Sequence, residues 1–262
     1  MTLHSISEFS RIERPAKSIF DTGAMFDSGF RDNTLLECFN CHFEALPANN
    51  LERIRAAQRI RYQVYCIEHP HENSDNPDGL EMDEFDAHAA QSLLVHRAAN
   101  ATLGTVRLIL PLANDAELSF PVQRVLDGDS LAAFRQLPLH STGEVSRFSI
   151  SREFRRVIHS CGSGTDAALA GNSAVLMRLG LIQALVRMSM ERGITHWCAA
   201  MEPTLLRMLS AMAIRFRPIG PLIEYHGLRQ PCYCVVADVL EDVKRERPAF
   251  WSVLTDGGAL LD

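Results

Sequence analysis

The amino-acid sequence predicts an α/β or α+β protein in which helices pack on a β-sheet. A strand is expected over Leu103–Leu110, where two-residue alternation puts Leu103, Thr105, Arg107 and Ile109 on one face. Along Asn50–Tyr65 apolar residues recur with the helical period, and a longer apolar helix is expected over Ala174–Arg192, stopped by Gly193. Strand-like segments interleave with these helices, which favours a sheet covered by helices.

Local signals indicate the remaining elements in chain order. Pro47 and the capping residues Asn49 and Asn50 predict the start of the first helix, and Pro203 predicts the start of another. The polar segment Asn73–Gly79 predicts a loop. The expected strands are Phe39–Leu46, Ser92–His96, Leu103–Leu110, Glu144–Ile150, Ile194–Met201, Ile214–Ile219 and Cys232–Val239, and the last expected helix is Pro203–Ala213.

The chain is expected to form one domain over residues 37–262, preceded by an irregular extension over residues 1–36. Within the domain, residues 155–173 are predicted to be an inserted loop around Gly162-Ser163-Gly164. A chain of 262 residues is long enough to bury a full core.

Composition excludes several classes of protein. The net charge of -6 argues against a surface devoted to nucleic acid. We expect no transmembrane segment and no signal peptide, and therefore a cytoplasmic protein. The seven cysteines are odd in number and lie mostly in apolar surroundings, which favours reduced, buried thiols. Nothing in the sequence indicates an oligomeric state.

Charged residues of both signs stand inside or beside apolar patterns. Such residues are rarely buried unless they are paired, so together they predict a buried polar site. For the arginine in the first helix, an alternative is that its stem covers the core while its head stays in water. The residues are Arg61, Asp83, Asp86, Arg107, Glu144 and Arg147.

Four short motifs occur in a fixed order: Arg61–Cys66, Glu81–Asp86, Gly104–Leu108 and Glu144–Phe148. With Met201–Pro203 and Glu224–Pro231 they resemble the acyltransferases associated with the PEP-CTERM/exosortase system. That group is similar to acyl-homoserine-lactone (autoinducer) synthases and N-acyl amino acid synthases of the GNAT superfamily. The resemblance spans roughly residues 40–250. It implies a GNAT-like three-layer α-β-α sandwich, whose mixed, mostly antiparallel sheet is splayed at a bulged strand.

The resemblance also implies which residues form the site. The catalytic candidates are Glu144, Arg107, Asp83 and Asp86. The tryptophan that autoinducer synthases carry after the first helix has no counterpart, which argues against S-adenosylmethionine as the substrate. The candidates for substrate binding are Arg61, Tyr65, Ser146, Arg147, Phe148, Tyr225 and Arg229.

These residue types suit the transfer of an acyl group from a thioester to an amine. The amine must lose a proton, and the tetrahedral oxyanion must be stabilised. Partial burial of Glu144 would raise its pKa from about 4.3 and make it a better base. The arginines either hold Asp83 and Asp86 ionised, or one of them clamps the carboxylate of the acceptor. The sequence leaves both roles open.

The spacing of Glu144 and Arg147 predicts an irregular strand. Residues an odd number apart lie on opposite faces of a regular strand, and a bulge would bring both to one face. In a regular strand, Arg147 would instead be a carrier-protein or structural contact.

The expected acyl donor is a thioester of acyl carrier protein or of coenzyme A, with no bound cofactor and no metal. Gly162, Gly164 and Gly171 do not form the usual Gly-spaced loop for coenzyme A, which favours the carrier protein. A local basic patch that suits this acidic partner is expected at Arg152, Arg155 and Arg156.

Two further groups have competing interpretations. Cys38-x-x-Cys41-His42 and Cys232-x-Cys234 contain possible zinc ligands, but their strand context favours buried thiols. Tyr225, His226 and Arg229 either bind the acceptor or protonate the leaving thiol, or they only pack a turn.

The sequence therefore predicts an N-acyltransferase that acts on the amine of an amino acid or a similar small acceptor. The alternative is an autoinducer synthase that uses S-adenosylmethionine. An alternative of another class is a non-catalytic acyl-binding or regulatory module of the same fold.

Overall fold

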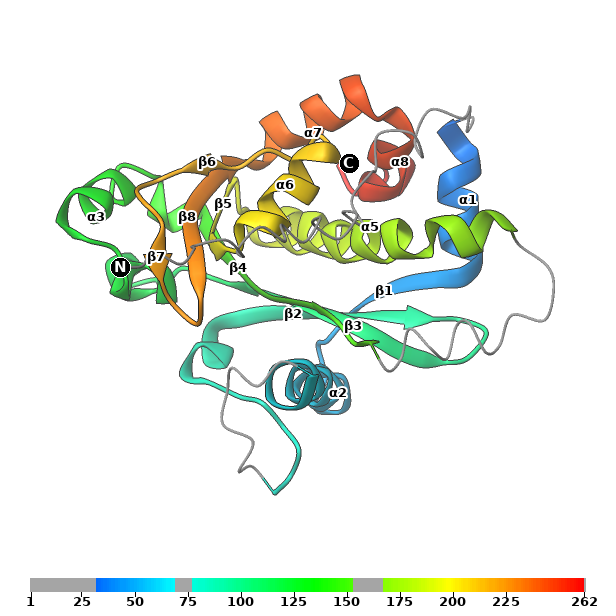
Figure 1. Cartoon of the computed structure of the whole chain (residues 1–262), viewed down its shortest axis with the longest axis horizontal. Coiled ribbons are helices and arrows are strands. Elements are labelled where there is room, and N and C mark those ends of the chain that lie inside the picture. The colour runs from blue at the N-terminus through cyan, green and yellow to red at the C-terminus, as the bar shows by residue number, and fades with distance from the viewer. Residues whose placement is uncertain (1–31, 69–76, 153–166, 262) are drawn as a thin grey trace, which may run out of the picture.

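The computed structural model describes residues 32–68, 77–152 and 167–261 (Figure 1). A central sheet carries the long helix α5 on one face and helix α2 on the other (Figure 1). The three layers and the mostly antiparallel sheet confirm the predicted fold class.

The strands of the sheet follow the order β1-β2-β3-β4-β5-β8-β6, with β7 paired to β8. Every pair is antiparallel except β4 with β5. The strands are β1 (Phe43–Pro47), β2 (Ala89–His96), β3 (Ala101–Ile109), β4 (Thr142–Ile150), β5 (His196–Met201), β6 (Arg217–Pro218), β7 (Ile223–Glu224) and β8 (Leu228–Val235).

Helices lie on both faces of the sheet (Figure 1). The sheet face that α2 covers also carries short segments from the part of the chain between α2 and β4. The helices are α1 (Asp32–His42), α2 (Leu51–Tyr62), α3 (Gly128–Phe134), α5 (Ala167–Arg192), α6 (Pro203–Ala211), α7 (Val236–Glu246) and α8 (Pro248–Thr255). The shorter segments are the π-helix η1 (Gln63–Glu68) and the 3-10 turns η2 (Glu84–His88), η3 (Ala116–Leu118), η4 (Pro121–Arg124), η5 (Leu139–Ser141) and η6 (Asp256–Gly258).

The sheet has a separate hydrophobic core on each face. Successive residues of β5 alternate between them, because side chains of a strand point to opposite sides. Trp197 enters the larger core under α5, where its indole N–H donates to Ser189 Oγ at 2.8 Å. Cys198 enters the smaller core, which it shares with Ile109 and Phe120.

Helix α5 contains the stretch Ser173–Arg192, which by length and apolar composition alone could cross a membrane. About two thirds of this stretch is buried inside the protein. A central core helix passes the same test, and α5 contacts strands β1 to β4.

The prediction was wrong at both ends of the domain. Where irregular chain and a strand were expected, α1 runs to His42 and buries Leu35 and Phe39 four residues apart. Strand β8 ends at Val235, before the predicted strand end, and α7 follows. Tertiary packing decides both cases, because α1 and α7 each lie against α8.

The predicted loop over residues 155–173 falls partly outside the described residues. Helix α5 already begins at Ala167, so the last part of that prediction was wrong. Most of the predicted extension, residues 1–31, also lies outside the described part of the chain.

Candidate active site

Arg61 and Arg107 lie side by side beneath the face of the sheet that α2 covers. The side chain of Arg61 is 0% exposed and that of Arg107 is 1% exposed. The guanidinium of Arg61 is therefore buried, contrary to the alternative of a solvated head. Charges this deep need partners of opposite sign, and the segment before β2 supplies them.

The segment Glu81–Asp86 is shaped by its own hydrogen bonds. Asp83 Oδ1 accepts the N–H of Phe85 at 2.9 Å, and Asp86 Oδ2 accepts the N–H of Asp83 at 3.2 Å. This capping box opens η2 and aims both carboxylates at the arginines. The local sequence thus positions the acids before any contact with the sheet.

Arg107 binds Asp83 in a bidentate pair, with Nη1–Oδ1 2.6 Å and Nη2–Oδ2 2.9 Å. Its Nη1 also lies 2.8 Å from Asp86 Oδ1, and its Nε donates to Ser146 Oγ at 2.9 Å. Two parallel N–H···O bonds fix the plane of both groups. Of the two roles left open for the arginines, the one in which they hold Asp83 and Asp86 is the one that Arg107 adopts in this structure.

Arg61 connects the remaining acids. Its Nη1 lies 2.6 Å from Asp86 Oδ1 and 3.3 Å from Gln91 Oε1, and its Nε donates to Glu81. The acidic cluster Glu81–Asp86 is expected to pair with arginines, but only Asp83 and Asp86 of it are predicted site residues; in the structure Glu81 joins them. Nothing in a loop without periodicity shows which carboxylate faces which arginine.

A bulge in β4 brings Arg147 to the same face, as predicted. Thr105 lies opposite Ser149, whereas Arg107 lies opposite Ser146, so β4 contains one extra residue. Arg147 adopts φ 51°, a left-handed conformation that is uncommon for a side chain of this size.

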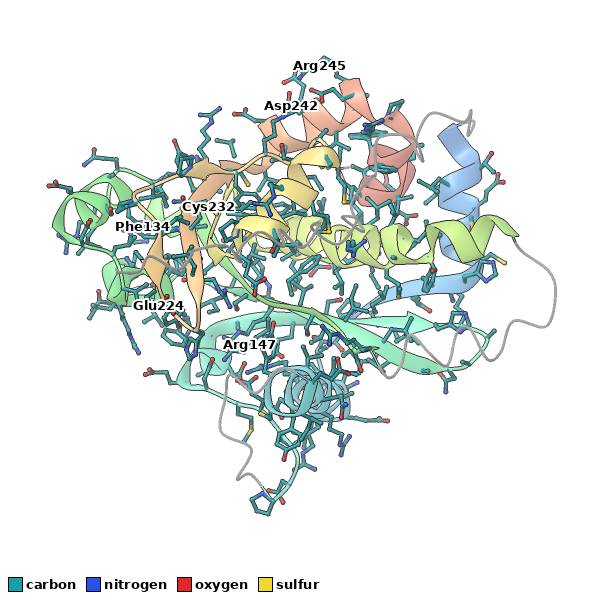
Figure 2. All side chains as sticks on the ribbon, in the orientation of Figure 1. Phe134, Arg147, Glu224, Cys232, Asp242 and Arg245 are labelled. Atoms are coloured by element: carbon teal, nitrogen blue, oxygen red, sulfur yellow. The ribbon has the colours of Figure 1, made fainter. Side chains whose placement is uncertain are left out.

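Arg147 lies between the sheet and α2 (Figure 2), where it contacts two acids. Its Nη2 lies 2.7 Å from Glu81 Oε1 and 3.2 Å from Asp83 Oδ2. Its guanidinium also lies 5.3 Å from the ring centroid of Tyr65. Tyr65 belongs to η1, a π-helical turn of a kind that is frequent at functional sites.

Replacing Gly104 by alanine should destabilise the protein next to this bulge. A Cβ at Gly104 would lie 2.5 Å from the backbone oxygen of Ser149 and 3.2 Å from Ile150 Cγ1. Such overpacking typically costs about 1–3 kcal/mol. The midpoint of urea unfolding measures the loss. Gly128→Ala is the matched control, because nothing lies within 4 Å of a Cβ there. Equal midpoints for the two variants would contradict the expectation.

Three arginines thus meet three carboxylates in one network. Burial alone would raise the pKa of Glu81, but hydrogen bonds from Arg147 and Arg61 outweigh it and hold that pKa below its ordinary value. The pKa of Asp83 is likewise lowered, because its hydrogen bond and charge pairing with Arg107 exceed the effect of burial. Glu81 and Asp83 are therefore ionised at neutral pH, so they are poor proton acceptors.

Glu144 lies apart from this network and differs from it in charge state. It is 4% exposed, stands between Ile109 and Cys198 on the neighbouring strands, and accepts the N–H of Val122 at 3.0 Å. Burial in this apolar site raises its pKa to about 7, although the Val122 hydrogen bond opposes the shift. A carboxyl that titrates near neutral pH suits a general base.

A cavity of about 560 Å³ opens where β4 and β5 separate. The two strands pair only from Thr142–Glu144 to His196–Cys198 and then diverge. The cavity touches both cores, since its wall includes Phe85 from one face and Met208 from the other.

Most predicted site residues line this cavity. Arg61 and Asp86 do not line it. They lie behind the wall, where Asp86 binds both Arg61 and the wall residue Arg107. The predicted residues on the wall are Tyr65, Asp83, Arg107, Glu144, Ser146, Arg147, Phe148, Arg152, Tyr225 and Arg229. Arg155 and Arg156 lie outside the described residues.

Other wall residues were not predicted, notably Arg178, Glu202 and Met208. Glu202 is the N-cap residue of α6, and Met208 lies within that helix. From the sequence alone, these positions look like ordinary helix residues that pack against the protein. Glu68 fixes the chain just after β4, where it accepts the hydroxyl of Ser151 at 2.6 Å and the N–H of Arg152 at 2.9 Å.

The prediction of buried thiols in a strand context was wrong for the first cysteine pair, because Cys38 and Cys41 lie in helix α1, where Cys38 is half-buried and Cys41 is exposed. No group of three or more histidine, cysteine or acidic side chains in the described residues is arranged to hold a metal ion. Cys198, Cys232 and Cys234 are buried free thiols, and burial raises the pKa of Cys232 to about 12. A thiol with such a pKa remains protonated at neutral pH, so it is a weak ligand and a weak nucleophile.

Residues 60–159 match the family model of the acetyltransferase (GNAT) domain. This range includes the predicted motifs from Arg61 to Phe148 and therefore the whole arginine–carboxylate network. A search of curated proteins returned no match.

Several solved structures have a fold similar to that of this chain. FeeM, an N-acyl amino acid synthase from uncultured soil microbes, is 17% identical with a TM-score of 0.50, covering 76% of this chain and 95% of that one. TofI in a ternary complex with an inhibitor and MTA is 16% identical, with a TM-score of 0.54. The match covers 79% of this chain and 99% of TofI. BjaI, a CoA-dependent acyl-homoserine lactone synthase with SAM and isopentyl-CoA, is 22% identical, with a TM-score of 0.52. The match covers 82% of this chain and 88% of BjaI. At these identities the likeness concerns the fold.

Proposed function

We propose that this chain, which carries an acetyltransferase (GNAT) domain, is an N-acyltransferase that transfers a fatty acyl group from a thioester to the amine of a small acceptor. The observation that carries the proposal is the position of Glu144. It is a buried carboxyl with a pKa of about 7 on the wall of the cavity between β4 and β5.

The reaction balances with Glu144 as the base. Glu144 accepts a proton from the acceptor ammonium, directly or through a water molecule. The freed amine lone pair attacks the thioester carbonyl and forms a C–N bond and a tetrahedral oxyanion. The nitrogen of this intermediate then loses its second proton, the C–S bond breaks and the carbonyl re-forms, and the leaving sulfur takes up that proton directly or through a water molecule. The proton on Glu144 is released to solvent. The products are an N-acylated amine and the free thiol of the donor.

The two faces of the sheet suit the two substrates. On the α5 and α6 side, the wall is formed by Val145, Phe148, Leu205 and Met208, which bury an acyl chain. On the α2 side it presents Asp83, Arg107 and Arg147, which suit a polar acceptor. The substrates would meet at the gap between the strands, beside Glu144.

The network holds this site in shape. Asp83, Arg107 and Arg147 form part of the wall, while Arg61, Glu81 and Asp86 hold them from behind. Charged groups that are fixed in advance do not have to reorganise during the reaction. We assign Arg61, Glu81 and Asp86 to positioning.

We propose acyl carrier protein as the preferred donor, in the cytoplasm, with coenzyme A thioester as the alternative. Arg152 is exposed at the end of β4 and lines the cavity, where it can meet an acidic carrier protein. Comparison of the two thioesters at equal concentration tests this preference.

The experiment that tests the proposed function incubates the purified protein with acyl carrier protein and coenzyme A thioesters and a pool of amino acids, with mass spectrometry as the readout. An N-acyl amino acid supports the proposal. A product that requires S-adenosylmethionine and carries a lactone replaces it with autoinducer synthesis. Absence of product with every donor, together with unchanged acyl binding in Glu144→Gln, identifies a non-catalytic acyl-binding module.

A further inference from the structure

A short turn, η4 (Pro121–Arg124), supplies a hydrogen bond to Glu144 from outside the sheet. Glu144 Oε2 accepts the N–H of Val122 at 3.0 Å, and both residues are buried. Pro121 has no N–H, and the first N–H groups of a helical turn have no partner within it. The N–H of Val122 is therefore the first donor of the turn that can serve a group outside it.

Gln123 ties this turn to the chain before it. Its backbone N–H donates to the backbone oxygen of Phe120 at 3.1 Å, and its side-chain Oε1 accepts the N–H of Phe120 at 2.9 Å. Its Nε2 also donates to the backbone oxygen of Ala116 in η3, at 3.4 Å. Gln123 is 7% exposed, so water competes little for these bonds. One buried side chain thus holds η4 through two polar contacts.

The salt bridge at the end of η4 is a weaker anchor. Arg124 lies over the ring of Phe85, 4.6 Å from its centroid, and pairs with Glu84. The side chains of Arg124 and Glu84 are 54% and 65% exposed, and pairs this exposed contribute little. Gln123 is therefore the stronger polar anchor of the turn.

The Val122 hydrogen bond is also the strongest influence that favours the ionised form of Glu144. Burial raises the pKa of Glu144, and the Val122 N–H opposes it more than the charges of Arg107 and Arg147 do, while Asp83 adds to the effect of burial. The position of one N–H thus has a large effect on the charge of the proposed base.

Two thiols lie close to Glu144 without adding charge. Cys198 is opposite Glu144 on β5, and Cys232 belongs to the next strand, β8. Burial raises the pKa of both thiols, so both are neutral near pH 7. They do not compete with Glu144 for a proton at that pH.

We propose that Gln123 is a positioning residue for the base: it holds the N–H of Val122 on the carboxylate of Glu144 and thereby sets the pH above which acyl transfer proceeds. This inference rests on the proposed function. An N–H donor binds a carboxylate more strongly than a neutral carboxyl, so the bond favours the ionised base. Without the amide of Gln123, η4 is free to shift, the bond weakens, and Glu144 ionises at a higher pH.

The test is the pH dependence of kcat in Gln123→Met, which keeps a side chain of similar size and removes the amide. The midpoint of the rising limb should move up by about one unit, as expected when a hydrogen bond to a charged group is weakened. At about pH 6 kcat should be about 10-fold lower than in the wild type, and above about pH 9 the two should converge.

The matched control is Gln183→Met. Gln183 is also buried, and its Nε2 donates to the backbone oxygen of Val253 at 2.7 Å, between α5 and α8. This variant loses a buried amide of the same kind, and its midpoint should equal that of the wild type. An equal shift in both variants would trace the effect to a general loss of stability and would overturn the proposal.

A lower kcat at every pH with an unmoved midpoint would show that Gln123 only supports the fold, which would also overturn the proposal. If Gln123→Met does not fold, Gln123→Asn replaces it. That amide is one methylene too short to reach the N–H of Phe120, so the midpoint should still rise.

The ionisation of Glu144 can also be followed without substrate, through the infrared band of its protonated carboxyl, which Glu144→Gln lacks. This measurement separates the two proposals. A wild type that acylates no amine would refute the proposed function. An infrared midpoint that is equal in the wild type and Gln123→Met would refute the role of Gln123.

Discussion

Replacing Glu144 by glutamine should lower kcat by about 10²- to 10⁴-fold, the usual contribution of a general base. Glutamine keeps the size of the side chain and its acceptor oxygen for the N–H of Val122, so the fold should persist. Thioester turnover under saturating substrates measures the loss. The control is Glu84→Gln, in which an exposed carboxylate bound to Arg124 is changed. A Glu144→Gln variant with kcat within about threefold of wild type would assign the proton to another group.

The same residue predicts how activity depends on pH. Only the ionised carboxylate accepts a proton, so kcat should rise with pH through the Glu144 pKa of about 7. The rising limb should be absent from the residual activity of Glu144→Gln. A profile that is flat from pH 5 to 8 would remove Glu144 from the role of base.

Replacing Arg107 by methionine should lower the free energy of unfolding by about 3–5 kcal/mol, because it removes a buried charge that Asp83 and Asp86 share and leaves each of them with one arginine partner. Arg107 binds Asp83 through two nitrogens and Asp86 through one of them. Urea unfolding at pH 7 measures the change.

The matched control for this variant is Arg215→Met. Arg215 is also paired with two acids, Asp242 and Glu246, but its side chain is 45% exposed. Pairs of this kind contribute about 0–1 kcal/mol. Similar losses in both variants would show that burial does not decide the strength of the network. If Arg107→Met does not fold, Asp83→Asn removes one charge from the same pair and should also be destabilising.

The free energy of unfolding should depend on pH in opposite ways through two groups of acids. Glu81 and Asp83 have lowered pKa values, so their stabilisation is present above their unfolded pKa of about 4 and is lost as pH falls. Glu144 has a raised pKa, so the folded state favours its neutral form. Its contribution is full below its unfolded pKa and is lost as pH rises toward 7. Glu144→Gln should therefore be more stable than the wild type above pH 7.

Pairing and spacing could be predicted where a physical conflict was visible in the sequence. Arg61 and Arg107 stand among apolar residues, which required partners, and Glu144 and Arg147 differ in parity, which required a bulge. The structure contains both the partners and the bulge. The particular partner of each arginine was not predictable, because Glu81 lies in a loop whose course depends on the capping box at Asp83.

The two ends of the domain were predicted poorly for a different reason. The residues Val236, Val239, Leu240 and Val243 have helical spacing, but their first members continue the apolar pattern of β8. The strand period and the helical period overlap there, so the boundary depends on packing against α8.

The divergence of β4 and β5 after Cys198 has a consequence for the order of events during turnover. Because the wall of this cavity includes residues from both cores, the proposed donor and acceptor would lie on opposite sides of the sheet and be bound together. Neither product has to depart before the second substrate arrives. Steady-state rates should therefore give intersecting lines in double-reciprocal plots, and thiol release should await the amine.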